Sequence, residues 1–316
     1  MSLSDFSNEN SEKKILLMGN KGVGKTSMRS IIFKNFSAKD TFNIPLTKQI
    51  ATSQVNFMGG NVLKILDCGG QEEFKKEYFQ SKIELFDNVK ILVFVVEAEK
   101  KKKNNQQDNN DDDILYFNKC VQSLEEHSPD AKIFVLIHKM DLICDDRKQI
   151  VFNTKKKEIE ENSGNFNVTC FPTTIWEHSL FKAWSCIMRS ITMNIEKLRK
   201  GLEILTEACG AEKIILFEKN SFLYICNSGK NEDEKIYESF SRIIKKMKLS
   251  FMKNDKQFIN MKLELKNFSI LVDEFTSNTA IMIYLSKKKI NFDLLGLNID
   301  LIRNDFEKII NHESND

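Results

Sequence analysis

An eight-residue glycine loop constrains the fold of this chain more than any other stretch. Residues 19–26 read Gly-Asn-Lys-Gly-Val-Gly-Lys-Thr, which matches the pattern G-x-x-x-x-G-K-T. An apolar run of strand length, 15–18, precedes the loop, and a segment that can be helical, 27–33, follows it. A strand, a glycine loop and a helix in this order form a phosphate-binding P-loop. The alternative is a chance glycine turn, and the Lys-Thr pair and both flanks argue against it.

Each residue type in this loop has a use in binding phosphate. Glycines let backbone N–H groups approach phosphate oxygens, and the N-terminus of the next helix adds partial positive charge. The Lys25 ammonium can reach the terminal phosphates, where it also serves catalysis, and the Thr26 hydroxyl can ligate Mg²⁺. The predicted contacts of this loop with the nucleotide come from Lys21, Gly22, Gly24, Lys25, Thr26 and Ser27.

Length and composition limit the class of protein. The 316 residues suggest two domains, and a net charge of +2 argues against a dedicated nucleic-acid surface. The seven cysteines are scattered without metal-ligand spacing and there is no signal peptide, which indicates a cytosolic protein with reduced thiols. The sequence has no apolar run of transmembrane length, no myristoylation glycine and no prenylation box, so we expect no direct membrane anchor.

Strands alternate with helices through the first part of the chain. This alternation predicts an α/β domain, a parallel sheet with helices on both faces, over residues 12–193 after a flexible tail at 1–11. In such a sheet, ligand sites lie at the carboxyl ends of the strands. The low-complexity stretch 100–113 is predicted to be a disordered surface insertion, and we assign it no function. The expected strands are 15–18, 52–57, 62–66, 91–96, 132–137 and 168–171.

The character of the chain changes after about Asn194. Residues 194–316 lack any phosphate-binding or catalytic set and predict a separate α+β domain with antiparallel strands. Its last strands, 268–272 and 280–285, contain no Pro, and their sheet has an edge that must be covered or paired. The other expected elements are a hairpin of 213–217 with 221–226 and helices around 198–205, 233–249 and 301–310.

Two further motifs follow strands of the first domain. Asp67 ends an apolar strand, where a Walker-B carboxylate would hold Mg²⁺ through water. Gly70 can offer a backbone N–H to a γ-phosphate, and Gln71 stands where it could orient an attacking water. Taken alone, the segment 67–71 could be an ordinary turn. Because it follows a P-loop and is separated from it by only one hairpin, it is a strong indication of nucleotide hydrolysis.

The segment 138–141, His-Lys-Met-Asp, has the shape of the N-K-x-D guanine motif with His in place of Asn. The Asp141 carboxylate can accept hydrogen bonds from both guanine N1–H and the N2 amino group, a pattern that adenine lacks. The stem of Lys139 can lie over the base. His138 could contact the base or be a satisfied structural histidine, and both alternatives stay open. Backbone N–H groups at Thr174 and Ile175 would approach the far edge of the base.

A threonine that senses Mg²⁺ should lie in the loop between Phe36 and Thr52. The candidates are Thr41 and Thr47. Thr47 is favoured because it leaves a reasonable run to the following strand. Thr41 is predicted either to contact the nucleotide or to be a loop residue only.

These motifs together resemble the Rag GTPases, on the A/B branch. The segment 275–279, Phe-Thr-Ser-Asn-Thr, is similar to that branch too, so the resemblance covers most of both domains. The other segments that carry it are Leu-Leu-Met-Gly at 16–19, Gly-Lys-Thr-Ser-Met-Arg-Ser-Ile-Ile-Phe at 24–33, Asp-Cys-Gly-Gly-Gln at 67–71, Ser-Pro-Asp-Ala-Lys-Ile-Phe at 128–134 and His-Lys-Met-Asp-Leu at 138–142.

The resemblance implies a Ras-like P-loop GTPase domain followed by a roadblock-type (longin-like) dimerisation domain. It implies GTP or GDP with Mg²⁺ as ligands and a heterodimer with a C/D-type Rag. Because no arginine occurs between Arg29 and Arg147, a span that holds both proposed switch segments, we expect slow hydrolysis that an activating protein stimulates in trans. The resemblance further implies docking on a lysosomal or vacuolar scaffold, from the cytoplasm, and relay of amino-acid sufficiency to the TOR kinase complex. Lys21 departs from the branch, which usually has a small residue there. The alternative function is therefore a nucleotide-bound scaffold that scarcely hydrolyses GTP.

Overall fold

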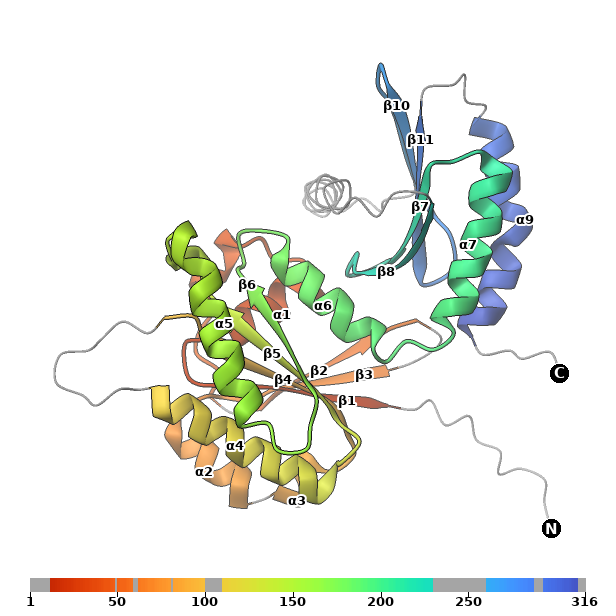
Figure 1. Cartoon of the computed structure of the whole chain (residues 1–316). Helices are drawn as coiled ribbons and strands as arrows, with labels where there is room; N and C mark the ends of the chain where they lie inside the picture. Colours follow the sequence, from red (N-terminus) through yellow and green to blue (C-terminus); the bar gives the residue numbers. More distant parts are fainter. Residues whose placement is uncertain are drawn as a thin grey trace, which may run out of the picture. The chain divides into compact units, whose positions relative to one another are not determined.

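The computed structural model of the chain describes residues 12–48, 50–58, 62–80, 82–99, 110–229, 260–286 and 292–311 (Figure 1). The chain forms two compact units. The second contains Trp184 and the residues that follow it, together with the short segments 32–37 and 57–59, and the first contains the rest. The domain boundary proposed at residue 194 stays a prediction.

The first unit is built on a six-stranded sheet with the order β2-β3-β1-β4-β5-β6. Every pair of neighbours is parallel except β2 and β3, which form an antiparallel hairpin. The α/β prediction is therefore confirmed, with one antiparallel edge strand. The strands are β1 (Lys13–Gly19), β2 (Ala51–Asn56), β3 (Val62–Asp67), β4 (Val89–Glu97), β5 (Lys132–His138) and β6 (Val168–Thr173).

Helices cover both faces of this sheet (Figure 1). One face carries a core in which Leu16, Phe94 and Val135 from three central strands pack against Phe117 and Leu124 of a helix. The central strands are apolar on both faces because both are covered, as expected for parallel strands. The helices are α1 (Lys25–Phe33), α2 (Glu72–Gln80), α3 (Lys82–Phe86), α4 (Asn110–His127) and α5 (Asp145–Glu161), with 3-10 turns η1 (Lys39–Asn43) and η2 (Met140–Leu142). Helix α6 (Ser179–Arg189) spans the division between the two units at Trp184.

The prediction of a loop through residue 113 was wrong for its last four residues. Helix α4 begins at Asn110, so 110–113 form its first turn, while 100–109 lie outside the described residues. Asp112 and Asp113 stand in the first turn, where the positive end of the helix dipole favours negative charge. The compositional bias of the stretch hid this helix start.

The second unit contains a five-stranded antiparallel sheet with the order β8-β7-β11-β10-β9. Helices α7 (Ile195–Cys209) and α9 (Phe292–Ile310) pack beside each other on one side of the sheet (Figure 1). The α+β expectation for this region agrees with these elements. The strands are β7 (Lys213–Glu218), β8 (Tyr224–Gly229), β9 (Asn260–Glu264), β10 (Phe268–Glu274) and β11 (Thr279–Ser286).

Three elements of this unit differ from their predictions. Strand β8 begins at Tyr224 rather than at Ser221, because Ser221 closes a turn by donating from its N–H to a Glu218 carboxylate oxygen at 2.6 Å. Strand β9 was missed because its alternating polar sequence is short, and α9 begins at Phe292, nine residues before the predicted start near 301. The helix predicted at 233–249 lies outside the described residues.

Across the described residues, none of the helices combines the length and the apolar character that crossing a membrane requires.

Candidate nucleotide-binding site

The glycine loop lies between the carboxyl end of β1, at Gly19, and the start of α1, at Lys25. Gly24 has a φ of +99°, and a Cβ there would lie 3.0 Å from the His138 ring. Only glycine satisfies both this backbone conformation and this close approach. The loop is therefore packed against the end of β5, which carries the second predicted motif.

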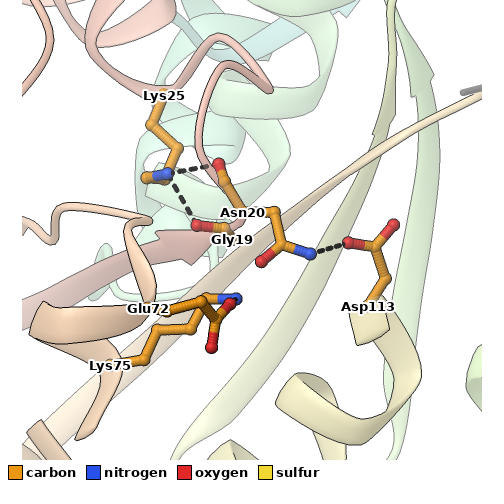
Figure 2. A network of polar contacts seen from close by, with 6 residues as sticks. All are labelled: Gly19, Asn20, Lys25, Glu72, Lys75 and Asp113. Atoms are coloured by element: carbon orange, nitrogen blue, oxygen red, sulfur yellow. Dashed lines mark hydrogen bonds and ion pairs between the residues drawn. The ribbon is translucent and has the colours of Figure 1, made fainter. Parts of the chain in front are cut away.

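The Lys25 ammonium is held inside the loop. It donates to the carbonyl oxygens of Gly19 at 2.7 Å and Asn20 at 2.9 Å (Figure 2). Burial lowers the pKa of Lys25 to about 8, and the nearby Asp67 carboxylate partly opposes that shift. A phosphate bound beside this group would favour its charged form. Lys25 is thus placed for the anion-binding role that the sequence predicts.

Two threonines expected to ligate Mg²⁺ lie side by side. The Oγ1 atoms of Thr26 and Thr47 are 2.7 Å apart, although 21 residues separate them in the chain. In an octahedral Mg²⁺ site with bonds of about 2.1 Å, neighbouring ligands lie about 3 Å apart. The two hydroxyls therefore fit adjacent positions on one Mg²⁺ ion. The remaining ligands would be water and phosphate oxygens, since the described residues hold no cluster of three His, Cys, Asp or Glu side chains.

Gly70 and Gln71 contact both the P-loop and the Thr47 segment. The Lys21 N–H donates to the Gly70 carbonyl at 3.1 Å, and the Gln71 Nε2 donates to the Thr47 carbonyl at 3.0 Å. The other amide atom, Gln71 Oε1, is buried and accepts no hydrogen bond from the described residues. A buried acceptor without a donor is costly. This oxygen fits a water molecule, which it could orient by accepting a hydrogen bond from it.

Asp67, the proposed Walker-B carboxylate, is fully buried at the end of β3. One of its oxygens lies 3.3 Å from the Nε of Arg29 on α1, and Arg29 also donates to the Ser53 hydroxyl on β2. Arg29 belongs to none of the motifs that the sequence predicts as part of the site. Its spacing of four residues after Lys25 puts both side chains on one face of α1, and this spacing was the available indication.

The P-loop, the Thr47 segment and the segment around Gly70 enclose a pocket of about 200 Å³ on the first unit. Two lysines and no carboxylate line it, which suits a polyphosphate. Asp67 and the guanine motif are not part of its lining, so the pocket corresponds to the phosphate end of the predicted site. The lining residues are Lys21, Gly22, Gly24, Lys25, Thr26, Ser27, Ile44, Pro45, Leu46, Thr47, Cys68, Gly69, Gly70 and Gln71.

His138 ends β5 and is only 2% exposed. Its Nδ1 is 2.9 Å from the Thr173 hydroxyl at the end of β6, and its ring approaches Gly24 of the P-loop. Burial lowers the pKa of His138 to about 4, so the ring is neutral at pH 7. Of the two alternatives left open by the sequence, these contacts favour the structural one, in which His138 ties the P-loop to β5 and β6.

The other two predicted residues of the guanine motif, Lys139 and Asp141, are held by hydrogen bonds to neighbouring segments. The Lys139 ammonium donates to the Gly22 carbonyl at 2.8 Å and pairs with Glu97 at the end of β4. One Asp141 oxygen accepts from the Thr174 hydroxyl at 2.6 Å. These contacts join the motif to the P-loop and to the loop after β6. Ile175 follows Thr174 half-buried, and its contact with the base stays a prediction.

Thr41 lies apart from the phosphate pocket. It belongs to η1, where its hydroxyl donates to the Ala38 carbonyl at 2.7 Å and is used inside the turn. Its side chain is buried and does not line the pocket. A contact of Thr41 with nucleotide stays a prediction, and this structure favours the loop-residue alternative.

Asp113 is a second residue that the sequence analysis missed. Its carboxylate is buried on the first turn of α4 and accepts a hydrogen bond from the Asn20 amide of the P-loop (Figure 2). Lys75 of α2, which pairs with Glu72 at 2.5 Å, lies 4.6 Å from the centre of the Tyr116 ring on the same helix as Asp113. Helix α4 therefore contacts both the P-loop and α2. The aspartate run at 111–113 gave no indication of which carboxylate would face the loop.

A P-loop, a strand-end carboxylate followed by Gly-Gly-Gln, and a Lys-x-Asp motif on one α/β sheet define a small G protein. The model of the Gtr1/RagA G protein conserved region matches residues 14–247, and the chain belongs to this family of Rag-type GTP-binding proteins. The chain is 39% identical to Ras-related GTP-binding protein A of Dictyostelium discoideum over 96% of its own length and 100% of that protein.

Two further relatives extend this comparison. GTP-binding protein GTR1 of Saccharomyces cerevisiae is 38% identical, over 94% of this chain and 99% of its own length. Ras-related GTP-binding protein C of Mus musculus is more distant, 26% identical over 73% of this chain and 57% of its own. The predicted resemblance to the A/B branch is thus confirmed.

Proposed function

We propose that this chain is a guanine-nucleotide switch that hydrolyses GTP slowly with Mg²⁺. The observation that supports it best is the set of contacts among three segments around one pocket. Thr47 bonds Thr26, Gln71 bonds Thr47, and Gly70 accepts from Lys21. A terminal phosphate in this pocket would hold the Thr47 segment and the Gly70 segment together. Its loss on hydrolysis would release both, as in other nucleotide switches.

The residues divide the work of this reaction. Mg²⁺, held by Thr26 and Thr47 and through water by Asp67, would neutralise charge on the phosphates. Lys25 stabilises the charge that develops on the transferred phosphoryl group. Gln71 orients the attacking water through its buried Oε1. Asp141 selects guanine by accepting hydrogen bonds from the base.

Hydrolysis by the isolated chain should be slow because no arginine occurs between Arg29 and Arg147. That span holds both proposed switch segments, and Arg29 is engaged with Asp67. An arginine finger contributes on the order of 10³–10⁵ in rate in related proteins. We therefore propose that an activating protein supplies the missing charge in trans.

Single-turnover hydrolysis of GTP, with and without a partner extract, tests this function. Wild-type chain should hydrolyse slowly alone and much faster with the extract. Gln71→Leu should bind GTP and resist stimulation, because leucine cannot orient water. Gln80→Leu, an exposed change on α2, is the matched control and should behave as wild type. Fast hydrolysis by the isolated wild-type chain, or normal stimulation of Gln71→Leu, would contradict the proposal.

Lys21 in the pocket lining favours one other candidate, a nucleotide-bound scaffold with negligible hydrolysis. A second cation beside the terminal phosphate could hold GTP in place without promoting its cleavage. The same assay separates the two functions. The scaffold predicts no stimulation of wild-type chain by any extract that activates a related G protein.

The second unit is proposed to be the roadblock-type dimerisation domain, pairing with a C/D-type Rag. Among the described strands, β9 lies at the edge of its sheet, and Leu294, Leu297 and Leu301 of α9 are exposed. An edge strand and exposed leucines both favour association. The match to a C-type relative is consistent with a family of two branches.

Truncation tests this division of labour. A chain ending before Asn194 should bind GTP as a monomer, while residues 194–316 should retain the partner. The full chain, co-expressed with a C-type partner, is the control. If the truncated chain still copurified with its partner at full stoichiometry, the assignment would be wrong.

The wider role proposed is that of the A/B-type subunit that relays amino-acid sufficiency to the TOR kinase complex. In this proposal, the chain is cytoplasmic and reaches the lysosomal or vacuolar surface through a scaffold complex. Family membership alone supports this part of the proposal. Fractionation of cells with and without the scaffold would test it, and membrane recruitment that did not depend on the scaffold would contradict it.

A further inference from the structure

Lys21 occupies the rim of the phosphate pocket beside the proposed catalytic glutamine. Its side chain is exposed, and the residue lines the pocket together with Thr47 and Gln71. Its backbone N–H donates to the Gly70 carbonyl at 3.1 Å. Lys21 therefore leaves the P-loop on the side where the two switch segments meet it.

The backbones of Lys21 and Gly70 are in direct contact. A Cβ added at Gly70 would lie 2.4 Å from the Lys21 nitrogen, so the two backbones pack against each other directly. This contact fixes the starting point of the Lys21 side chain relative to Gly70. Gly70 is the residue proposed to donate its N–H to the terminal phosphate. The Lys21 side chain therefore starts next to the position that this phosphate would occupy.

The two lysines that line the pocket, Lys21 and Lys25, differ in the hydrogen bonds that their ammonium groups make. They are the two cations in a lining that contains no carboxylate. The Lys25 ammonium is bonded to the loop carbonyls of Gly19 and Asn20. The Lys21 ammonium makes no hydrogen bond or ion pair with any of the residues that the structure describes. A lysine on a flexible stem, beside a pocket of this charge, is a phosphate ligand available for use.

We propose that Lys21 binds the terminal phosphate and makes this site prefer GTP over GDP. The inference rests on the proposed function, because it takes the pocket to hold a guanine nucleotide. Lys25 and the loop N–H groups serve the phosphates that both nucleotides share. Lys21 acts on the one phosphate that GDP lacks, so its contribution appears in the ratio of the two affinities.

Equilibrium binding of the full-length chain tests this proposal without measuring hydrolysis. Dissociation constants for GDP and for a non-hydrolysable GTP analogue are measured with Mg²⁺ for wild type, Lys21→Ser and Lys21→Arg. Lys21→Ser should weaken binding of the analogue by about tenfold and binding of GDP by less than about twofold. A tenfold loss is the size expected for one charge-assisted contact. Lys21→Arg should keep most of the wild-type ratio.

Two controls separate a specific contact from a general charge effect. Lys39→Ser removes an exposed lysine of the same unit that does not line the pocket, and it should leave the ratio unchanged. Raising the ionic strength should shrink the difference between wild type and Lys21→Ser, because salt screens an exposed charge.

The outcomes that overturn the inference are distinct from failure of the proposed function. If wild type binds both nucleotides and Lys21→Ser leaves their ratio unchanged, Lys21 does not contact the terminal phosphate. An equal loss for GDP and the analogue would also refute it, since Lys21 would then only maintain the loop. If wild type bound neither nucleotide, the proposed function would fail first, and this inference with it.

Discussion

The two units of this chain differ in what several of their buried polar side chains do. In the first unit, Lys25, Asp67 and His138 follow different strands and meet around one edge of a parallel sheet. In the second unit, buried polar groups close the turns of an antiparallel sheet. Glu218 accepts from the Ser221 N–H at 2.6 Å, and the Thr276 and Thr279 hydroxyls bond each other at 2.6 Å.

The direction of the strands explains this difference. Parallel strands all end at the same edge, so residues far apart in the chain are brought to one place. Antiparallel strands end at alternating edges, so each turn satisfies its own polar groups. Changes at Lys25, Asp67 or His138 should therefore affect both stability and nucleotide binding. Equivalent changes in the second unit should affect stability alone.

The largest effect is expected from Arg29→Leu. It leaves the fully buried Asp67 carboxylate without its ion-pair partner, and removing one member of a buried pair costs about 3–5 kcal/mol. Urea unfolding of the first unit measures this loss, and nucleotide affinity should fall with it. The double change Arg29→Leu with Asp67→Leu should recover much of the stability, because neither member of the pair is then left buried without the other. A single variant as stable as wild type would show that the pair is not buried as described.

A smaller effect is expected from pH through His138. Its pKa is lowered from 6.5 to about 4 in the folded chain by burial, so the unfolded chain binds this proton first as the pH falls. Above pH 6.5 both states hold the neutral ring, and stability is unaffected. Between pH 6.5 and 4 the unfolding free energy should fall by about 1.4 kcal/mol per pH unit from this group.

The comparison variant for this pH dependence is His138→Asn, since an amide does not titrate. Its unfolding free energy, measured by urea titration at each pH, should fall less steeply than that of wild type from pH 6.5 to 5. Parallel curves for the two proteins would contradict a buried neutral His138.

The smallest effect is expected from Glu218→Ala in the second unit. The change removes the acceptor for the N–H groups of Asn220 and Ser221, which costs about 1–3 kcal/mol of stability. GTP affinity should stay within about twofold of wild type. A large loss of GTP affinity in Glu218→Ala would break the contrast between the two units.

The sequence predicted the first unit well because its motifs are local. The P-loop is one continuous stretch, and each later motif directly follows an apolar strand. The closeness of Thr26 and Thr47 was also expected, since both were predicted to ligate one Mg²⁺ ion. Motifs at strand ends can therefore be recognised from the order of residues alone.

What could not be predicted depends on the packing of side chains from distant elements. Arg29 meets Asp67 across α1 and β3, and Asp113 meets Asn20 across 93 residues. Neither pair belongs to a motif. In the second unit, the start of β8 depends on the turn in which the Glu218 carboxylate accepts a hydrogen bond from the Ser221 N–H. This contact could not be predicted from the sequence.

The central claim, a guanine-selective site, is tested most directly at Asp141. Dissociation constants for GTP and xanthosine triphosphate are measured for wild type, for Asp141→Asn and for Asp146→Asn, an exposed control on α5. Asp141→Asn presents an amide donor to guanine donors, and one such mismatch costs roughly 1–3 kcal/mol, about a 5- to 150-fold loss. We predict that Asp141→Asn loses affinity for GTP and gains affinity for xanthosine triphosphate, because the C2 carbonyl of xanthine suits the new donor. Asp146→Asn should behave as wild type. Unchanged GTP binding in Asp141→Asn would contradict the account.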